Sequence, residues 1–98
     1  MKRLDLIFNE KELKQIIKII EAHGVTGYSV TKHVTGKGPN STVSEDLEFT
    51  GVGANAHMII FCEDEILIKM SQGKLLGLLD YYGGVAYASE AMPLQASY

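Results

Sequence analysis

The hydrophobic and polar positions of this chain change period several times, and each change predicts a new element. Residues 2–8, KRLDLIF, alternate loosely between polar and apolar side chains, as a half-buried strand does. From Glu10 the apolar positions fall three and four residues apart, which predicts an amphipathic helix. Asn9 with Glu12 resembles a capping box at its start, and Gly24 is a favourable stop. The apolar face of this helix consists of Leu13, Ile16, Ile17 and Ile20.

Two further strand patterns flank a long polar segment. Residues 26–34, TGYSVTKHV, are rich in β-branched and aromatic side chains, and residues 56–62, AHMIIFC, are apolar enough for a central strand. Between them, residues 35–55 contain glycines, a proline, many small polar residues and the acidic stretch SEDLEF. This segment holds roughly a fifth of the chain, far more than a connection needs. We therefore expect it to be a functional loop.

The last part of the chain predicts a helix and a closing strand. Apolar residues from Ile66 to Leu79 follow helical spacing, although Gly73 and Gly77 interrupt them. The break YYGG at residues 81–84 precedes residues 85–91, VAYASEA, which alternate again as a strand. The order βαββαβ predicts an α+β ferredoxin-like sandwich, in which an antiparallel sheet carries two helices on one face. We expect one domain over residues 1–98, with an uncovered sheet face that an oligomer would bury.

Composition narrows the classes of partner. The net charge is −3, and Arg3 is the sole arginine among nine basic residues, which argues against nucleic acid. An anion site in this chain must therefore depend on lysine, backbone N–H groups or a helix end. Cys62 is the sole cysteine and is expected in the core, so no disulfide and no metal site are predicted. No signal peptide or membrane span is apparent, so we expect a cytoplasmic protein.

Two stretches, EAHGVTGYSVTKHVTGKG at residues 21–38 and LLDYYGGVAYASEAMPL at residues 78–94, resemble the PII-like signalling proteins. The resemblance covers nearly the whole chain and is closest to the carbon-side branch. That branch comprises the carboxysome-associated PII-like proteins and the PII-like partners of bicarbonate transporters. It implies a non-enzymatic homotrimer that binds adenine nucleotides in clefts between its subunits. The long loop would be the T-loop, at about residues 35–55, which senses ligand and docks on partners.

The resemblance also implies the residues of a nucleotide site. Carried over by position, the adenosine would lie against Gly27 and Ser29 of the second strand and Ile60 and Phe61 of the third. The phosphate groups would lie between the T-loop base, Gly36, Lys37 and Gly38, and the turn formed by Tyr82, Gly83 and Gly84. No catalytic residue, no metal ligand and no tightly bound cofactor are expected.

This chain departs from the best-known PII proteins because it lacks their C-terminal arginines, the lysine of the turn after the second helix and a T-loop tyrosine. With so few cations, AMP, ADP or cyclic AMP suits the site better than ATP, which remains a further candidate together with bicarbonate. The implied role is regulation of bicarbonate uptake or of carboxysome-linked metabolism. The T-loop would dock on a membrane bicarbonate transporter and so place the protein at the periphery of the inner membrane.

Two alternatives remain open at this point. His33, His57 and Cys62 motivate a metal-binding trimer related to the copper-tolerance proteins. A small acylphosphatase-like hydrolase would share the topology, but it needs an arginine in a phosphate loop, and Arg3 is on a strand. For Tyr81 and Tyr82, contact with a ligand and a role in the core are equally supported.

Overall fold

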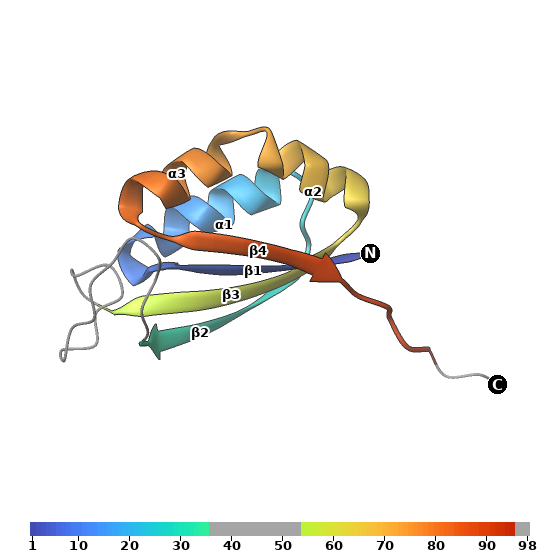
Figure 1. Cartoon of the computed structure of the whole chain (residues 1–98), viewed down its shortest axis with the longest axis horizontal. Coiled ribbons are helices and arrows are strands. Elements are labelled where there is room, and N and C mark those ends of the chain that lie inside the picture. The colour runs from blue at the N-terminus through green and yellow to red at the C-terminus, as the bar shows by residue number, and fades with distance from the viewer. Residues whose placement is uncertain (36–53, 96–98) are drawn as a thin grey trace.

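The structure is a computed structural model that describes residues 1–35 and 54–95. The elements, in chain order, are β1 (Lys2–Asn9), the 3-10 helix η1 (Glu10–Glu12), α1 (Leu13–Ala22), β2 (Tyr28–Val34), β3 (Asn55–Cys62), α2 (Asp64–Ser71), α3 (Lys74–Tyr82) and β4 (Val85–Glu90). Over these two ranges the sheet has four strands in the order β2-β3-β1-β4, and each neighbouring pair is antiparallel. The helices lie together on one face of the sheet (Figure 1). The predicted ferredoxin-like α+β fold is therefore confirmed.

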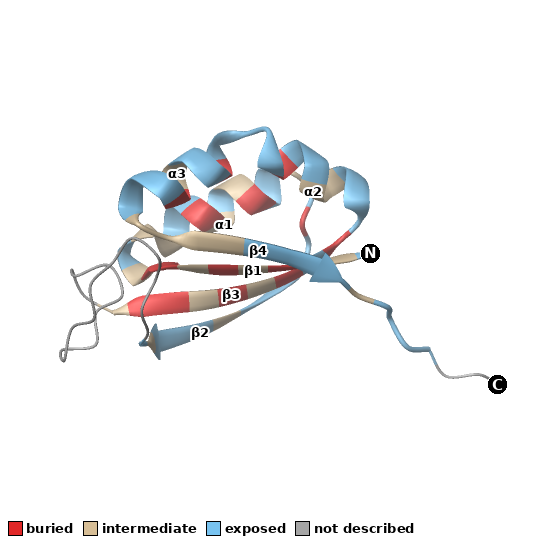
Figure 2. Cartoon of the chain, viewed as in Figure 1, coloured by how far each residue is buried: buried red, intermediate tan, exposed pale blue. Residues whose placement is uncertain are grey.

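The core lies between the helices and the sheet face that they cover. Because side chains alternate along a strand, every second residue of the central strands points toward the helices. Figure 2 shows the buried positions on β1, on β3 and on the inner sides of the helices. The strands contribute Leu4, Leu6, Phe8, Ala56, Met58, Ile60 and Cys62, and the helices contribute Ile16, Ile20, Met70, Leu75 and Leu79. The predicted apolar face of the first helix and the buried Cys62 are thus confirmed.

The first helix begins more gradually than predicted. The Oδ1 atom of Asn9 accepts a hydrogen bond from the backbone N–H of Lys11 at 2.9 Å, which confirms Asn9 as a cap. The turn that it caps is η1, so the α-helical part starts at Leu13. The carboxylate of Glu12 accepts a hydrogen bond from Gln15 at 3.1 Å. At the other end, Gly24 adopts a φ of +91°, the left-handed conformation that ends a helix at little cost.

The prediction of one helix across Gly73 is wrong, because α2 ends at Ser71 and α3 begins at Lys74. Gly73 has an extended backbone, with φ −99° and ψ −154°. The apolar spacing gives the reason. Met70 and Leu75 are both fully buried but stand five residues apart, and a continuous helix aligns side chains three or four apart. The break lets both side chains enter the core, and it leaves Leu76 exposed.

The turn between α3 and β4 brings its backbone against β1. Gly83 caps α3 with a left-handed φ of +81°, and Gly84 donates a backbone hydrogen bond to the carbonyl oxygen of Leu79 at 2.7 Å. A Cβ atom on Gly84 would lie 2.8 Å from the carbonyl oxygen of Ile7 and 2.9 Å from Cδ2 of Leu79. Those distances are too short for any side chain. Gly84 is therefore required for packing, whatever else it contacts.

We expect Gly84→Ala to lower the free energy of unfolding by about 2 kcal/mol, because the added methyl group overpacks a site that contains backbone. Gly77→Ala is the matched control, since a Cβ there meets nothing within 4 Å and alanine favours a helix interior. Urea unfolding of both variants at one protein concentration measures the effect. Equal stability of the two variants would contradict the close approach at Gly84.

Candidate functional site

The sheet face that points away from the helices, called here the open face, carries a hydrogen-bonded charged network. Asp5 Oδ1 accepts hydrogen bonds from His57 Nε2 at 2.8 Å and from Arg3 Nη2 at 3.1 Å. Asp5 Oδ2 accepts from Arg3 Nε at 3.0 Å. The hydrogen bond from Arg3 lowers the pKa of Asp5 below its ordinary value of 3.8, and His57 adds to this while burial opposes it. The carboxylate is thus held in its charged form between two donors.

Large apolar side chains surround this network on the open face. Ile59 and Tyr87 are the cross-strand partners of Asp5, and Phe61 is the partner of Arg3. Phe61 and Tyr87 are 52% and 61% exposed, so a single subunit leaves them largely in water. A face that combines exposed aromatic residues with an internally paired charge cluster is suited to burial against another protein surface.

Glu10 ties both ends of the predicted T-loop to η1. On one side, Glu10 Oε2 accepts a hydrogen bond from the backbone N–H of His33 at 2.7 Å and lies 3.2 Å from His33 Nδ1. On the other side, the backbone N–H of Glu10 donates to the carbonyl oxygen of Ala54 at 3.0 Å. His33 is the extra residue of a bulge between Lys32 and Val34 and has a φ of +59°. This anchor was not predicted.

Asn55 also holds the two ends of this segment together. It is fully buried at the start of β3, and its Nδ2 donates to the carbonyl oxygen of Val34 at 3.3 Å. Its Oδ1 has no partner within the part of the chain that the structure describes. An asparagine directly before the apolar run AHMIIFC was the available sequence signal, since a polar residue there must be hydrogen-bonded.

The predicted nucleotide contacts fall into two groups at opposite ends of the sheet. Gly27 and Ser29 are exposed at the start of β2, near the end of β3 that carries Phe61, because Tyr28 pairs with Ile60. The turn at residues 82–84 lies at the other end, against Ile7, beside the ends of the predicted T-loop (Figure 1). From Tyr28 to Val34 the strand covers about 20 Å at 3.3 Å per residue. One subunit therefore does not bring the two groups together.

The two predicted contacts on β3, Ile60 and Phe61, point to opposite faces of the sheet. Ile60 is fully buried beneath the helices, whereas Phe61 points to the open face, because successive strand residues point to opposite faces. The two therefore do not present side chains to one surface, and Phe61 alone offers its ring to a ligand. Gly36, Lys37 and Gly38 lie outside the described residues.

The tyrosine pair at the end of α3 is exposed. Tyr81 and Tyr82 pack edge to face, with ring centroids 4.8 Å apart and an interplanar angle of 78°. Their exposed fractions are 81% and 39%, so neither ring closes the core of the subunit. Both rings are available to a ligand or to a second subunit at this end of the sheet.

The three residues that motivated a metal site are not brought together. His33 contacts Glu10, and His57 donates to Asp5 on the open face. Cys62 is buried on the helix-covered face, and burial, aided by the nearby acidic charges, raises its thiol pKa. Across residues 1–35 and 54–95 no cluster of three His, Cys, Asp or Glu side chains is suited to a metal ion. The copper-type alternative therefore has no support from the described geometry.

Comparison with known proteins identifies the family. Residues 1–95 match the family model described as nitrogen regulatory protein P-II. The chain belongs to the PII family. No protein of the curated set matches it. Members of this family are non-enzymatic signalling proteins, generally trimeric, that bind adenine nucleotides. This confirms the prediction of a signalling protein and removes the hydrolase alternative.

Solved structures show the same fold. CPII from Thiomonas intermedia K12, a PII-like protein bound to ADP and bicarbonate, is 19% identical with a TM-score of 0.73, over 90% of this chain and 82% of that one. The same protein bound to ADP, AMP and bicarbonate is 18% identical, with a TM-score of 0.72, over 95% and 94%. A putative PII-like signalling protein of Thermus thermophilus is 20% identical, with a TM-score of 0.67, over 90% and 83%. At such identity the likeness establishes the fold alone.

The helices of the described segments are all too short or too polar to span a bilayer.

We expect Asp5→Asn to lower the free energy of unfolding at pH 7 by about 1 kcal/mol, through loss of the charge-assisted hydrogen bonds. Because the folded-state pKa of Asp5 lies below its ordinary value, the stabilisation is fully present above about pH 4 and is lost as the pH falls through the lower, folded-state value. Urea unfolding of both proteins at pH 7 and near pH 2 measures this difference. A stability gap that stays constant between these pH values would contradict the role given to Asp5.

Proposed function

We propose that this PII protein is a homotrimer that binds an adenine nucleotide in the clefts between its subunits. The observation that carries this proposal is the separation of the two groups of candidate residues by the length of β2. In a closed ring, each subunit offers one end of its sheet to one neighbour and the other end to the next. A cleft then combines Gly27, Ser29 and Phe61 of one subunit with the T-loop base and the 82–84 turn of another.

The open face supports the trimer. Its Arg3–Asp5–His57 network is already internally paired, so burial does not strand an unpaired charge. The neighbouring Phe61 and Tyr87 gain from burial, as do Met92 and Leu94 beyond β4, which are 81% and 91% exposed. Residues 91–95, which follow β4, extend away from their own subunit (Figure 1), which is the geometry of a segment that packs against a neighbour.

The charge of the site favours a nucleotide with few phosphates. The described turn at residues 82–84 contains no cation, and the N–H groups of Gly83 and Gly84 already donate to the carbonyl oxygens of Asp80 and Leu79. The positive charge for phosphate binding therefore comes from Lys37 of the loop. With so little positive charge to balance phosphate groups, the site suits AMP, ADP or cyclic AMP better than ATP. That CPII binds ADP and AMP with bicarbonate supports these nucleotides, with bicarbonate as a second ligand, for the present chain.

The regulatory role follows from the loop and from the carbon-side resemblance. We assign residues 35–55 as the T-loop, which changes when nucleotide or bicarbonate binds at its base. Through it the protein regulates bicarbonate uptake or carboxysome-linked metabolism, by docking on a membrane transporter from the cytoplasm. Glu10 holds both ends of this loop, through His33 and Ala54. This supports the role, since a nucleotide bound at the base of the loop would then contact the part of the chain from which the loop extends.

Isothermal titration of AMP, ADP, ATP and cyclic AMP, each with and without bicarbonate, tests the ligand. We expect binding of AMP or ADP, and about tenfold weaker binding by Lys37→Ala because a charge-assisted contact is lost. Lys11→Ala, which removes an exposed lysine outside both groups, should bind as the parent protein does. Absence of heat with every nucleotide would refute the proposal, and an unchanged Lys37→Ala variant would make the loop base a hinge only.

Mixed trimers test whether the site is shared. Gly27→Leu should fold, because a Cβ at Gly27 meets nothing within 4 Å, but it should block the adenosine side, and Lys37→Ala should weaken the phosphate side. After the two variants are unfolded and refolded together, about one quarter of the clefts should combine two intact halves and regain parental affinity. Recovery of no high-affinity sites, in trimers verified by native mass spectrometry, would show that each site lies within one subunit.

A further inference from the structure

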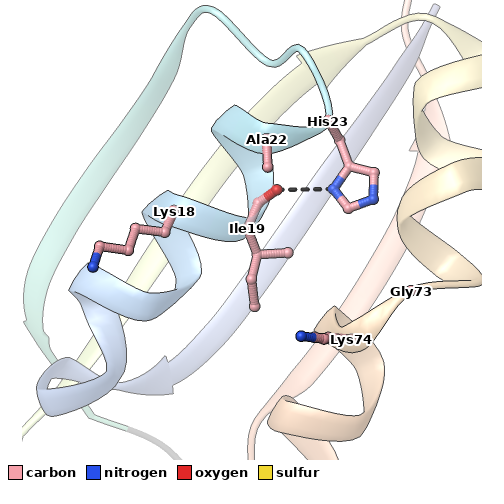
Figure 3. Close-up of a pocket in the computed structure, with 6 residues that line it drawn as sticks. All are labelled: Lys18, Ile19, Ala22, His23, Gly73 and Lys74. Atoms are coloured by element: carbon pink, nitrogen blue, oxygen red, sulfur yellow. Dashed lines mark hydrogen bonds between the residues drawn. The ribbon is translucent and has the colours of Figure 1, made fainter.

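A cavity on the helical layer lies between the C-terminal end of α1 and the break between α2 and α3 (Figure 3). Its volume is about 390 Å³, within the range of small-molecule sites. It is lined by Lys18, Ile19, Ala22, His23, Gly73 and Lys74. The space exists because Ala22 and Gly73 occupy positions where larger side chains would fill it.

The lining joins cations to an apolar surface. Lys74 and His23 line one cavity together with Lys18, whose ammonium group points away from the other two (Figure 3). No acidic side chain lines it, in a chain whose net charge is −3. Ile19 and Ala22 supply an apolar wall between them. Such a combination suits a ligand with a small anionic group and an uncharged body.

The orientation of His23 distinguishes between anionic groups. Its Nδ1 donates a hydrogen bond to the carbonyl oxygen of Ile19 at 2.8 Å, so Nε2 is the ring nitrogen that is left for a ligand (Figure 3). That nitrogen faces Gly73, 3.5 Å from the position of a Cβ there. A phosphate monoester, whose second pKa is about 6, can donate its remaining proton to this nitrogen or, as the dianion, accept a hydrogen bond from the protonated ring. A carboxylate is deprotonated at neutral pH and can accept a hydrogen bond from the protonated ring only.

We propose that this cavity is a binding site for a small organic monophosphate. The phosphate contacts Lys74 and His23, with Lys18 at the rim, and the organic body lies on Ile19 and Ala22. The site is on the layer opposite the open face, so a trimer formed through the sheet leaves it accessible. It shares no residue with the two groups assigned to the nucleotide, so either assignment can fail without the other.

Phenyl phosphate is the probe, with inorganic phosphate and phenol as its two separate halves. In ¹H–¹⁵N NMR titrations we expect phenyl phosphate to shift the signals of Ala22, His23, Gly73 and Lys74 and to bind more tightly than either half. Lys74→Ala should weaken binding about tenfold. Lys14→Ala is the matched control, because it removes an exposed lysine one helical turn from Lys18 that does not line the cavity.

A second variant tests the space rather than the charge. Gly73→Ala should fold normally, since its Cβ would make only ordinary contacts, at 3.5 Å from His23 Nε2 and 3.6 Å from Lys69 O. It should nevertheless weaken the binding of phenyl phosphate, because the added methyl group narrows the cavity in front of His23 Nε2. Saturating ADP, added first, should leave the phenyl phosphate shifts intact. Equal weakening by Lys14→Ala and Lys74→Ala, unchanged binding by Gly73→Ala, or displacement by ADP would each overturn the assignment.

Discussion

The antiparallel pairing of β1 with β3 is the constraint on which the rest of this structure depends. The register runs without interruption from Lys2 opposite Cys62 to Asn9 opposite Asn55. Because the side-chain period of a strand is two residues, a slip of one position would expose Leu4, Leu6 and Phe8 and bury the carboxylate of Asp5. The same register therefore builds the core on one face and the charged network on the other. Every feature assigned to function is placed relative to these two strands.

The helical layer gives each functional region a separate support. α3 runs from the cavity at Gly73 to the turn at Gly84, where the backbone rests on β1. The break before α3 thus has two effects, since it allows Leu75 into the core and opens the space beside His23. At the far end, the absence of a side chain at Gly84 lets the turn approach the sheet. Glycine at these two positions shapes both ends of one short helix.

Sequence patterns predicted those parts of the structure that depend on neighbouring residues alone. The alternation in β1, the apolar run of β3 and the cap at Asn9 are local, so the order of elements and the ferredoxin-like fold followed from them. The break at Gly73 depends on which side chains the core accepts, and an isolated glycine does not reveal this. The bulge at His33 depends on Glu10, which is 23 residues earlier in the chain. A hydrogen-bond partner that is this distant in the chain cannot be recognised from the residues around His33.

The candidate site shows the same division between local and tertiary information. The opposite orientation of Ile60 and Phe61 follows from strand parity and was accessible from the sequence alone. The distance between the start of β2 and the turn at Gly84 was not, because it requires the strand order. The resemblance to PII-like proteins named the residues of a site, whereas the topology showed that one subunit keeps them apart. Burial of Asn55 likewise required the position of β3 against β1 and β2.

The anchoring of His33 and Ala54 by Glu10 has a consequence for how this domain tolerates change. Val34 and Asn55 are cross-strand partners, so the pairing of β2 with β3 already holds the two ends of the intervening segment together. Its closure entropy then depends only weakly on its length, at about 0.6 kcal/mol for each doubling. Residues can be inserted, deleted or replaced there without altering the register of the sheet. The domain is in this sense a fixed frame for an exchangeable insert, whose sequence can evolve independently of folding.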